Sequence, residues 1–460
     1  MVEEEEEGGD FDNEENRLLE TWHNHPNLKR TLRFPTWIVP SAHCQKLLSS
    51  PLLQEHLGRE ENIQPRIRIA RSYRPKDDDS EGTGQVLLLR NPAAPPLSSD
   101  TLEALWKSLD HDDDDDDNDD DDDGGKSTAV GSLLRDGPVV EIPVTHRNWT
   151  VSHILKQLLP VRVHPPPTAF EQVGHVAHLN LREAHLAYGR LIGNVLCECH
   201  GSQIKTVVNK VGEVSGKHRT YQMDLLAGRP DYNVRVLENG VTLRFDLSKV
   251  YWCSRLSGER KYLIQHEFRS GETIADPFCG VGALCLQTKR HLPSCIVWAN
   301  DWNPHAVEAF EENARSHKVR VEKLECRDAD EFLMDLGLLH GHELPHHVVM
   351  NYPLEATKFL PALRWWPTKP TDRKTMVHIY TFARADPSTN RSVLDVAVDQ
   401  VADGLLPTPE PCPGDGEHLN ELGCNVRARL VRDVSPNKVV VCVSFEVTQR
   451  LLRHMQGDYV

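Results

Sequence analysis

The chain has 460 residues, of which 39% are hydrophobic and 26% are charged. This length allows two or three domains, and the composition is typical of a water-soluble globular protein. No apolar run is long enough to cross a bilayer, so we expect no membrane partner. The first residues, "MVEEEEEGGDFDNEEN", lack the regions of a signal peptide and are too acidic for a transit peptide. The 11 cysteines follow no disulfide framework and indicate reduced intracellular thiols.

The net charge of −17 comes from two short runs. Residues 3–15 hold nine acids and residues 110–123 hold twelve, and neither run contains Lys or Arg. Without these 21 acids the net charge of −17 becomes +4, so the remainder is mildly basic. Runs of like charge repel themselves and favour disorder. A polyanionic partner is therefore compatible with the sequence.

The first third of the chain alternates between folded and acidic segments. We expect residues 1–27 to be a disordered acidic N-terminus and residues 28–75 to form a small domain, because short strand-like and helix-like stretches begin at "KRTLRFPTWIVP". Residues 76–137 contain "KDDDSEGTG", a Pro-rich piece and the Asp run, which predicts a low-complexity acidic insertion or linker.

Residues 138–258 are predicted to form an α+β domain. "NWTVSHIL" places a Thr cap before a helical pattern. "HLNLREAHLAYGRLIGNVLCE" predicts one amphipathic helix with Leu186, Leu191, Ile192 and Val195 on its apolar side. Later runs alternate like strands, and "ENG" between two of them indicates a hairpin.

Residues 259–460 alternate strand and helix, which predicts an α/β fold with a mostly parallel sheet. In such sheets ligands bind beyond the carboxyl ends of the strands. The stretch "TIADPFCGVG" ends a strand on Asp276, and Gly280 and Gly282 then allow a tight turn and a close approach to a ligand. The third glycine of the dinucleotide-binding pattern is missing, so this loop alone is a weak signal.

The next strands repeat the same design. "CIVWANDWNP" ends in Asp301, where an acid can bind a ribose diol. "KLECRDADEFL" places Asp328 and Ala329 to meet an adenine edge, and "HHVVMNYP" ends at Asn351. Four consecutive strand ends with polar groups favour a ligand site over a purely structural sheet.

The chain resembles the eukaryotic and archaeal tRNA (guanine-37-N1)-methyltransferases over roughly residues 140–450. The resemblance rests on motifs that include "GHVAHLNLREAHL", "VVNKVGEVSGKHRTYQMDLLAG", "FDLSKVYWCSRLSGER", "DPFCGVGAL", "NDWNPHAVE", "NYPLEATKFL" and "VRDVSPNKVVVCVSFEV". It implies a class I Rossmann-like methyltransferase domain preceded by α+β RNA-binding domains, with S-adenosyl-L-methionine as cofactor and tRNA as partner. It further implies a monomer that works in the nucleus and cytoplasm, and in the mitochondrial matrix in some relatives. The compartment stays open.

The resemblance also implies roles for individual residues. Methylation of guanine N1 requires a base for its proton and a donor or cation for the charge that develops on O6. Glu259 in "SRLSGER" is implied as the base and Arg219 in "KHRTYQ" as the O6 stabiliser, with Asn351 and Tyr251 beside the guanine. From the residues alone, Glu259 could equally form a surface ion pair beside Arg260.

The resemblance implies more cofactor-binding residues than the strand-end residues alone. It comprises Arg260, Asp276, Gly280, Gly282, Asp301, Trp302, Asp328, Ala329 and Asn351. Three positions depart from the usual family pattern. Ala283 stands in place of a proline, and Trp302 and Tyr352 stand in place of leucines. Arg260 stands where eukaryotic relatives often have His. The Tyr352 change bears most on the fit of the substrate base.

Two further patterns have competing interpretations. "CECH" (197–200) and "GHVAHLN" (174–180) have ligand-like spacing, but they lie on predicted helices without a second zinc-type pair, and methyl transfer to nitrogen needs no metal, so we expect none. Basic strings at 217–219, 259–261, 364–374 and 427–432 could contact tRNA phosphates. The two Trp at 364–374 suit stacking on bases or a half-buried loop.

Three other functions compete with this hypothesis. A sister family transfers the aminocarboxypropyl group of the same cofactor to tRNA. A nicotinamide oxidoreductase would use a similar sheet, but it is disfavoured by the missing glycine and by "NYP". A catalytically inactive tRNA-binding protein is disfavoured by the presence of both Glu259 and Asn351.

Overall fold

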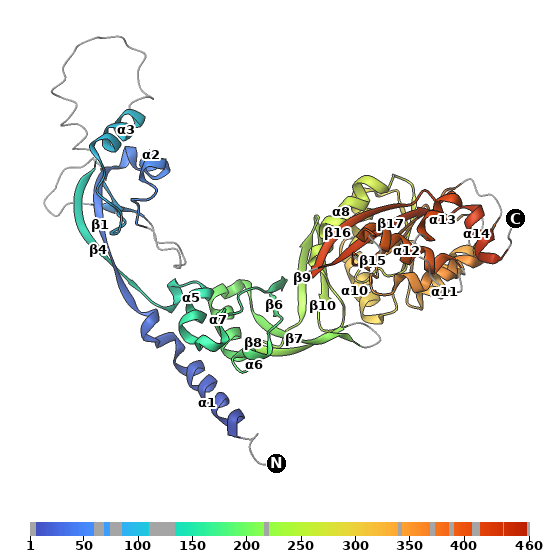
Figure 1. Ribbon diagram of the computed structural model, residues 1–460, viewed down its shortest axis with the longest axis horizontal. Coiled ribbons are helices and arrows are strands. Elements are labelled where there is room, and N and C mark those ends of the chain that lie inside the picture. The colour runs from blue at the N-terminus through green and yellow to red at the C-terminus, as the bar shows by residue number, and fades with distance from the viewer. Residues whose placement is uncertain are drawn as a thin grey trace, which may run out of the picture. The chain divides into compact units, whose positions relative to one another are not determined.

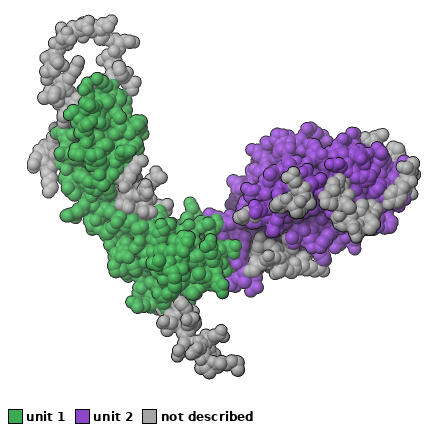
Figure 2. All heavy atoms as spheres, in the orientation of Figure 1, with its two compact units in different colours: residues 1–170, 179–209, 226–228 green, residues 171–178, 210–225, 229–460 purple. Residues whose placement is uncertain are grey.

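The computed structural model describes most of the chain. The described residues are 6–58, 69–73, 85–109, 134–215, 220–338, 343–368, 373–385, 391–406, 415–435 and 437–457. They fall into two compact units (Figure 2), which are residues 1–170, 179–209 and 226–228, and residues 171–178, 210–225 and 229–460. Among the described residues no helix is long and apolar enough to span a membrane.

The first unit contains an antiparallel four-stranded sheet of order β2-β3-β1-β4, of which Figure 1 labels β1 and β4. Its strands are β1 (Arg30–Pro40), β2 (Ala70–Tyr73), β3 (Gln85–Leu89) and β4 (Arg135–Val144). Helices α2 (Cys44–Ser49) and α3 (Ser99–Leu109) share its core, in which Trp37, Val39, Leu47, Leu88 and Leu105 are buried.

This sheet corrects the prediction that residues 76–137 are an insertion or linker. Strand β3 lies between β1 and β2, so it is a central strand of the domain. Helix α3 buries Leu105 completely in the same core. The low-complexity composition around these elements hid them, because a five-residue strand and a short helix give weak periodic signals. The Asp run at 110–123 lies outside the described residues.

The N-terminus also differs from the expectation of disorder over residues 1–27, because α1 (Glu6–Thr21) is helical. The Tyr188 hydroxyl donates to Glu14 at 2.7 Å, and the Leu191 backbone N–H donates to Glu15 at 3.0 Å. Leu191 lies in the first turn of α7 (Gly189–His200), where backbone N–H groups lack partners and carboxylates are favoured. Glu14 and Glu15 belong to a run of acids that repel one another, and these contacts at and beside the first turn of α7 stabilise them. Short 3₁₀ turns η1 (Trp22–Asn24) and η2 (Pro26–Leu28) follow.

The rest of this unit is mainly helical. Helix α5 (Val151–Leu158) begins after Thr150, whose hydroxyl accepts from the His153 N–H at 3.2 Å, so the predicted cap is confirmed. The single helix expected over residues 178–198 is split into α6 (Glu183–Leu186) and α7, which buries Leu191, Ile192 and Val195. Leu186 is 51% exposed and does not belong to that apolar face.

Two β structures connect this part of the chain to the large sheet. One sheet has the order β5-β6-β7-β8, with strands β5 (Glu171–Val173), β6 (Val176–Leu179), β7 (Thr206–Ser215) and β8 (Thr220–Gly228). The other is the hairpin of β9 (Asn233–Glu238) and β10 (Val241–Asp246). Its turn residues Asn239 and Gly240 have φ values of 48° and 80°, the left-handed conformation of a tight two-residue turn. The predicted hairpin is confirmed.

The hairpin belongs to the second unit, which begins its main segment at residue 229. The Asn313 side chain accepts from the Arg244 N–H at 2.8 Å, and the Asn239 amide donates to Gln287 at 2.8 Å. These bonds tie the hairpin to helices α10 (Pro304–Ser316) and α9 (Ala283–His291). The structural boundary therefore precedes the expected domain start at residue 259.

The core of the second unit is a seven-stranded sheet of order β13-β12-β11-β14-β15-β17-β16. All neighbours are parallel except β17, which pairs antiparallel with β15 and β16. The strands are β11 (Thr273–Asp276), β12 (Ile296–Asn300), β13 (Lys323–Glu325), β14 (His347–Met350), β15 (Met376–Ala383), β16 (Arg427–Ser435) and β17 (Lys438–Glu446).

Helices cover both faces of this sheet (Figure 1). They are α8 (Ser257–Tyr262), α9 (Ala283–His291), α10 (Pro304–Ser316), α11 (Ala329–Leu338), α12 (Val393–Leu405), α13 (Asp415–Glu421) and α14 (Gln449–Gln456), with the 3₁₀ segment η11 (Ala356–Trp365). One core contains Phe332, Leu360 and Phe445, and another contains Phe268, Ile274 and Tyr380. Because helices lie on both sides, every residue of β11 and β14 is buried. The predicted α/β fold with a mostly parallel sheet is confirmed.

Candidate active site

A cavity of about 290 Å³ lies where the central strands end. Its lining contains Asp276 after β11, Asp301 after β12, Asp328 beyond β13 and Asn351 after β14. The carboxyl ends of parallel strands meet at one edge of a sheet, which brings these four side chains together. The four strand-end residues singled out in the sequence thus line one cavity.

The loop after β11 uses its two glycines differently. Gly280 and Gly282 both have positive φ values, 54° and 84°. A Cβ at Gly282 would lie 2.3 Å from the Phe310 ring, so glycine allows the loop to pack on α10. A Cβ at Gly280 would meet no atom within 4 Å, and Gly280 lines the cavity. The first glycine is therefore required by backbone conformation and the second also by packing.

Asp276 is 4% exposed at the floor of this loop. Its Oδ1 accepts from the Phe278 N–H at 3.1 Å, and the Cys285 thiol lies 3.8 Å from its Oδ2. Burial raises the pKa of Asp276 to about 7, with a smaller contribution from the charge of Asp301. A cationic ligand in the cavity would favour the ionised form.

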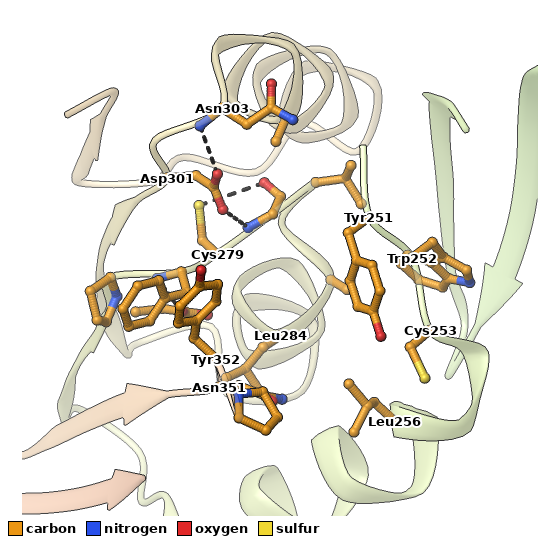
Figure 3. A pocket seen from close by; sticks show the side chains of 18 of the residues that line it. Tyr251, Trp252, Cys253, Leu256, Cys279, Leu284, Asp301, Asn303, Asn351 and Tyr352 are labelled. Carbon is orange, nitrogen blue, oxygen red and sulfur yellow. Dashed lines mark hydrogen bonds between the residues drawn. The ribbon is translucent and has the colours of Figure 1, made fainter. Parts of the chain in front are cut away.

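Asp301, which follows β12, holds the loop after β11 in place. Figure 3 shows its carboxylate between Asn303 and the glycine loop. One oxygen accepts from the Gly280 N–H at 2.8 Å and the other from the Asn303 N–H at 2.9 Å. The carboxylate also lines the cavity, where a ligand hydroxyl can approach it. Trp302 follows, 46% exposed and also part of the lining.

Asp328 and Ala329, the two residues predicted to meet the adenine, lie at the start of α11. Asp328 accepts from the Asp330 N–H at 2.9 Å, so its carboxylate caps this helix. Ala329 is the first residue of the helix and is buried. Both line the cavity, as the prediction requires.

Asn351 provides an acceptor that no described residue uses. Its Oδ1 is buried without a hydrogen-bond partner in the described part of the chain. A buried unsatisfied acceptor is costly, and in a cavity wall it indicates a ligand donor. Beside it the Tyr352 ring stacks on Phe278 at 5.1 Å between centroids, and Phe359 meets Phe278 edge-on at 5.2 Å. Tyr352, which replaces the usual leucine, thus extends an aromatic wall.

Glu259 lies on α8 and lines the same cavity. It is 6% exposed, so the alternative of a surface ion pair beside Arg260 is wrong. Its Oε2 accepts from Arg429 Nη1 at 2.7 Å, while Oε1 accepts from Arg429 Nη2 and the Tyr380 hydroxyl. Three acceptor positions are occupied, and one on Oε2 is left by these bonds.

Arg260 has a different partner. Its Nε and Nη2 donate to the two oxygens of Glu238 at 2.6 and 2.7 Å, and Gln287 donates to the same carboxylate at 2.8 Å. Glu238 ends β9, so this buried pair fastens α8 to the hairpin. Arg260 lines the cavity, but most of its donors are committed to the protein.

Two residues of the site were not found by sequence reasoning. Arg429 was grouped with a basic string expected to contact tRNA, and Tyr380 had no motif. The first is on β16 and the second on β15, and β17 lies between these strands. Only the sheet order brings them to Glu259, so no local pattern could have revealed them. The Arg429 guanidinium also lies 3.9 Å from the Tyr262 ring centroid.

Of the other two predicted substrate residues, the structure describes Tyr251 alone. Tyr251 lines the cavity with 43% of its surface exposed, which leaves its ring accessible to a base. Arg219 lies outside the described residues.

Two arginines of the described basic strings have acidic partners. Arg427 pairs with Glu267 at 3.1 Å, in addition to the Arg429–Glu259 pair. Of the two tryptophans at 364–374, Trp366 is fully buried and donates to the Leu333 carbonyl, whereas Trp365 is 51% exposed. Only Trp365 fits the stacking hypothesis.

The sequence "GHVAHLN" was predicted to be helical, but His178 lies on strand β6. Its nearest acid is Glu171, at 4.0 Å. Cys197 and Cys199 do lie on α7, as predicted. Neither pattern brings together a set of cysteine and histidine ligands among the described residues.

The sheet order, the glycine loop and the acids at successive strand ends define the class I, S-adenosylmethionine-dependent methyltransferase fold. The TRM5/TYW2 methyltransferase domain family matches residues 234–402, and the TYW2 N-terminal domain family matches residues 151–231.

Relatives in other organisms extend the match beyond these domains. The chain is 44% identical to tRNA (guanine(37)-N(1))-methyltransferase 2 of Phaeodactylum tricornutum, over 93% of this chain and 77% of the relative. It is 31% identical to tRNA (guanine(37)-N(1))-methyltransferase of Drosophila pseudoobscura pseudoobscura, over 68% of this chain and 70% of the relative. The chain belongs to the tRNA (guanine(37)-N(1))-methyltransferase family.

Solved structures agree on the fold. Trm5b from Pyrococcus abyssi superposes with a TM-score of 0.57 at 18% identity, covering 90% of this chain and 99% of the other. The structure of aTrm5 in complex with tRNALeu gives a TM-score of 0.54 at 18% identity, covering 90% of this chain and 100% of the other.

Proposed function

We propose that this protein transfers the methyl group of S-adenosyl-L-methionine to N1 of guanosine 37 in tRNA. Membership of the family supports the reaction. The observation that carries the proposal is a buried carboxylate, Glu259, in the same cavity as the strand-end acids. A base and a cofactor site in one cavity are what methylation of a protonated ring nitrogen requires.

The donor set of the cavity fits this cofactor. Asp276 and the unpaired Oδ1 of Asn351 suit the cationic methionine end, Asp301 suits the ribose hydroxyls, and Asp328 suits the adenine edge. A dinucleotide would instead place its diphosphate against the buried carboxyl of Asp276, which disfavours an oxidoreductase. When bound, the cofactor supplies a methyl group already activated by its sulfonium, so the protein's task is alignment and proton removal.

Glu259 is the proposed base. The guanine N1 proton must leave as the new N–CH₃ bond forms, and the open acceptor position on Oε2 can receive it. Arg429 and Tyr380 are proposed as positioning residues, since they fix the orientation of the carboxylate through three hydrogen bonds. Neither residue is required to touch the substrate in this scheme.

The remaining roles come from the family resemblance. Arg219 is proposed to stabilise the charge on O6, and Tyr251 to stack on or orient the base. The exposure of Tyr251 at the cavity is compatible with such stacking. The resemblance also supports a monomer that needs no metal for transfer and works in the nucleus and cytoplasm, with the mitochondrial matrix as a further compartment.

Mass analysis of tRNA nucleosides tests the proposed function. Purified protein, unmodified tRNA and S-adenosylmethionine should yield 1-methylguanosine, and a tRNA with adenosine at position 37 should not. The sister activity would instead add an aminocarboxypropyl group, which has a different mass. Either that product or no modified guanosine at all would overturn the proposal.

The raised pKa of Asp276 predicts a pH-dependent cofactor affinity. Its pKa is about 7 in the structure, and a cationic ligand favours the ionised carboxylate. If the cofactor binds only that form, affinity should fall about tenfold from pH 8 to pH 6. Calorimetry across this range with wild-type protein should show the fall, and Asp276→Asn should have weaker but pH-independent binding. A wild-type affinity that is constant from pH 6 to 8 would contradict this.

A further inference from the structure

A cluster of two histidines and one glutamate lies in the first unit, and none of its members lines the catalytic cavity. His23 is on η1, directly after α1, and His146 is on η6 (His146–Asn148), between β4 and α5. Glu198 is in the last turn of α7. One ligand atom from each lies within 4.8 Å of the others. Three segments far apart in the sequence therefore converge.

The contacts inside the cluster are short. His23 Nε2 lies 2.5 Å from Glu198 Oε2, and His146 Nε2 lies 3.0 Å from Oε1. The cluster is partly shielded, because the His146 side chain is 14% exposed and the adjacent Trp22 is buried. Trp22 stacks on the His23 ring at 4.0 Å and meets the His146 ring edge-on, which fixes both imidazoles.

Both ring nitrogens of His146 have polar neighbours. Its Nδ1 lies 3.1 Å from the backbone carbonyl oxygen of His23, which can only accept, so Nδ1 carries the proton. In neutral histidine the other nitrogen, Nε2, is then an acceptor, yet it faces a carboxylate oxygen. Nε2 of His146 and Oε1 of Glu198 therefore lie side by side as two ligand atoms of one cation would.

We propose that this cluster binds a divalent transition-metal ion of the zinc class. Two histidines and a glutamate are a known zinc ligand set, with water at the fourth position. The ring N–H of His146 donating to a carbonyl is the usual outer bond of a metal-bound histidine, which orients the ligand nitrogen toward the ion. Tetrahedral bonds of about 2.0–2.2 Å put ligand atoms roughly 3.4 Å apart. The atoms now in contact at 2.5 and 3.0 Å would therefore separate, and any pair near the 4.8 Å limit would approach.

Of the surrounding charges, one favours the binding of a cation and another disfavours it. The carbonyl end of α7 carries partial negative charge beside Glu198, which favours a cation. Arg147 lies 3.8 Å from Glu198, but its side chain is 78% exposed, so water screens it. A bound ion would join the end of α1 to η6 and α7. Its role is to fasten the N-terminal segment within the first unit, separate from methyl transfer.

Zinc binding to the full-length protein tests this proposal. Chelator-treated protein dialysed against buffered zinc should hold one more ion per chain than Glu198→Gln or His23→Gln, measured by elemental mass spectrometry. Each variant should lose at least about tenfold in affinity at this site. Zinc should raise the melting temperature of the wild type but not of Glu198→Gln. His43→Ala removes a histidine of the same unit outside the cluster, so it should behave like the wild type.

Cobalt substitution separates this site from the free cysteines. The absorption spectrum of cobalt-loaded wild type minus that of cobalt-loaded Glu198→Gln should show the visible bands of tetrahedral cobalt. It should show no thiolate charge-transfer absorption. Equal metal content and affinity in the wild type and both variants would overturn the proposal. In that case the cluster is a hydrogen-bonded contact without a metal ion.

Discussion

Glu259→Gln should reduce the single-turnover rate of methyl transfer by about 10²–10⁴, the usual cost of removing a positioned base. Glutamine keeps the size of the side chain but cannot accept the N1 proton. Because that proton moves only in the chemical step, binding of tRNA and cofactor should change far less than the rate. Rapid-quench measurement with enzyme in excess over tRNA, from pH 6 to 8, gives the relevant rate.

The buried environment of Glu259 requires matched controls. Its replacement leaves Arg429 without a charged partner, and breaking such a pair can destabilise a protein by about 3–5 kcal/mol. Glu259→Asp retains the charge in a shorter side chain, so a folded but slow variant would point to misplacement of the base.

Glu267→Gln breaks another glutamate–arginine pair in the same unit, one that does not line the cavity, and should transfer at the wild-type rate. If Glu259→Gln is folded and transfers methyl as fast as the wild type at every pH, Glu259 is a structural ion-pair partner and not the base.

Asp301→Ala should weaken cofactor binding by about 1.5–3 kcal/mol, or roughly 10- to 150-fold. The substitution removes a charge-assisted bond to the ribose hydroxyls. It also releases the Gly280 and Asn303 N–H groups, so the loop under the cofactor loses its anchor. Both effects act in the same direction. Titration calorimetry at a fixed pH measures the change, with circular dichroism to verify folding.

Two variants separate these contributions. Asp301→Asn keeps one acceptor oxygen and should show a smaller loss than alanine. Asp395→Ala removes an acid that accepts from Ser392 at the start of α12, outside the cavity, and should leave cofactor affinity unchanged. An Asp301→Ala protein that binds the cofactor as tightly as the wild type would exclude the ribose assignment.

The strand-end residues were predictable because their positions follow from local patterns and one topological rule. Short apolar runs identify buried parallel strands, and such strands align their carboxyl ends. Asp276, Asp301, Asp328 and Asn351 therefore had to lie together once the sheet was recognised. The Thr150 cap and the turn at Asn239 were equally local, because each depends on the preferences of a few adjacent residues.

The surroundings of the base depended on tertiary structure. Glu259 is 170 residues from Arg429 and 121 from Tyr380 in the chain. The contact forms because β17 inserts antiparallel between β15 and β16, a register that no sequence window encodes. Sequence proximity suggested Arg260 as the partner, but the side chains of adjacent helical residues point in different directions.

Order at the N-terminus had the same long-range origin. Composition predicted disorder for the acidic run, since its charges repel and it buries little apolar surface. Contacts with residues about 175 positions away reverse that outcome, because Glu15 pairs with an N–H at the start of α7 that would otherwise be unsatisfied. The sequence by itself determined the sheet, the cofactor edge and the family, because these depend on local periodicity and short motifs. Only the tertiary structure decided which charges meet, because a charge is stabilised by whatever partner the fold brings within a few ångströms.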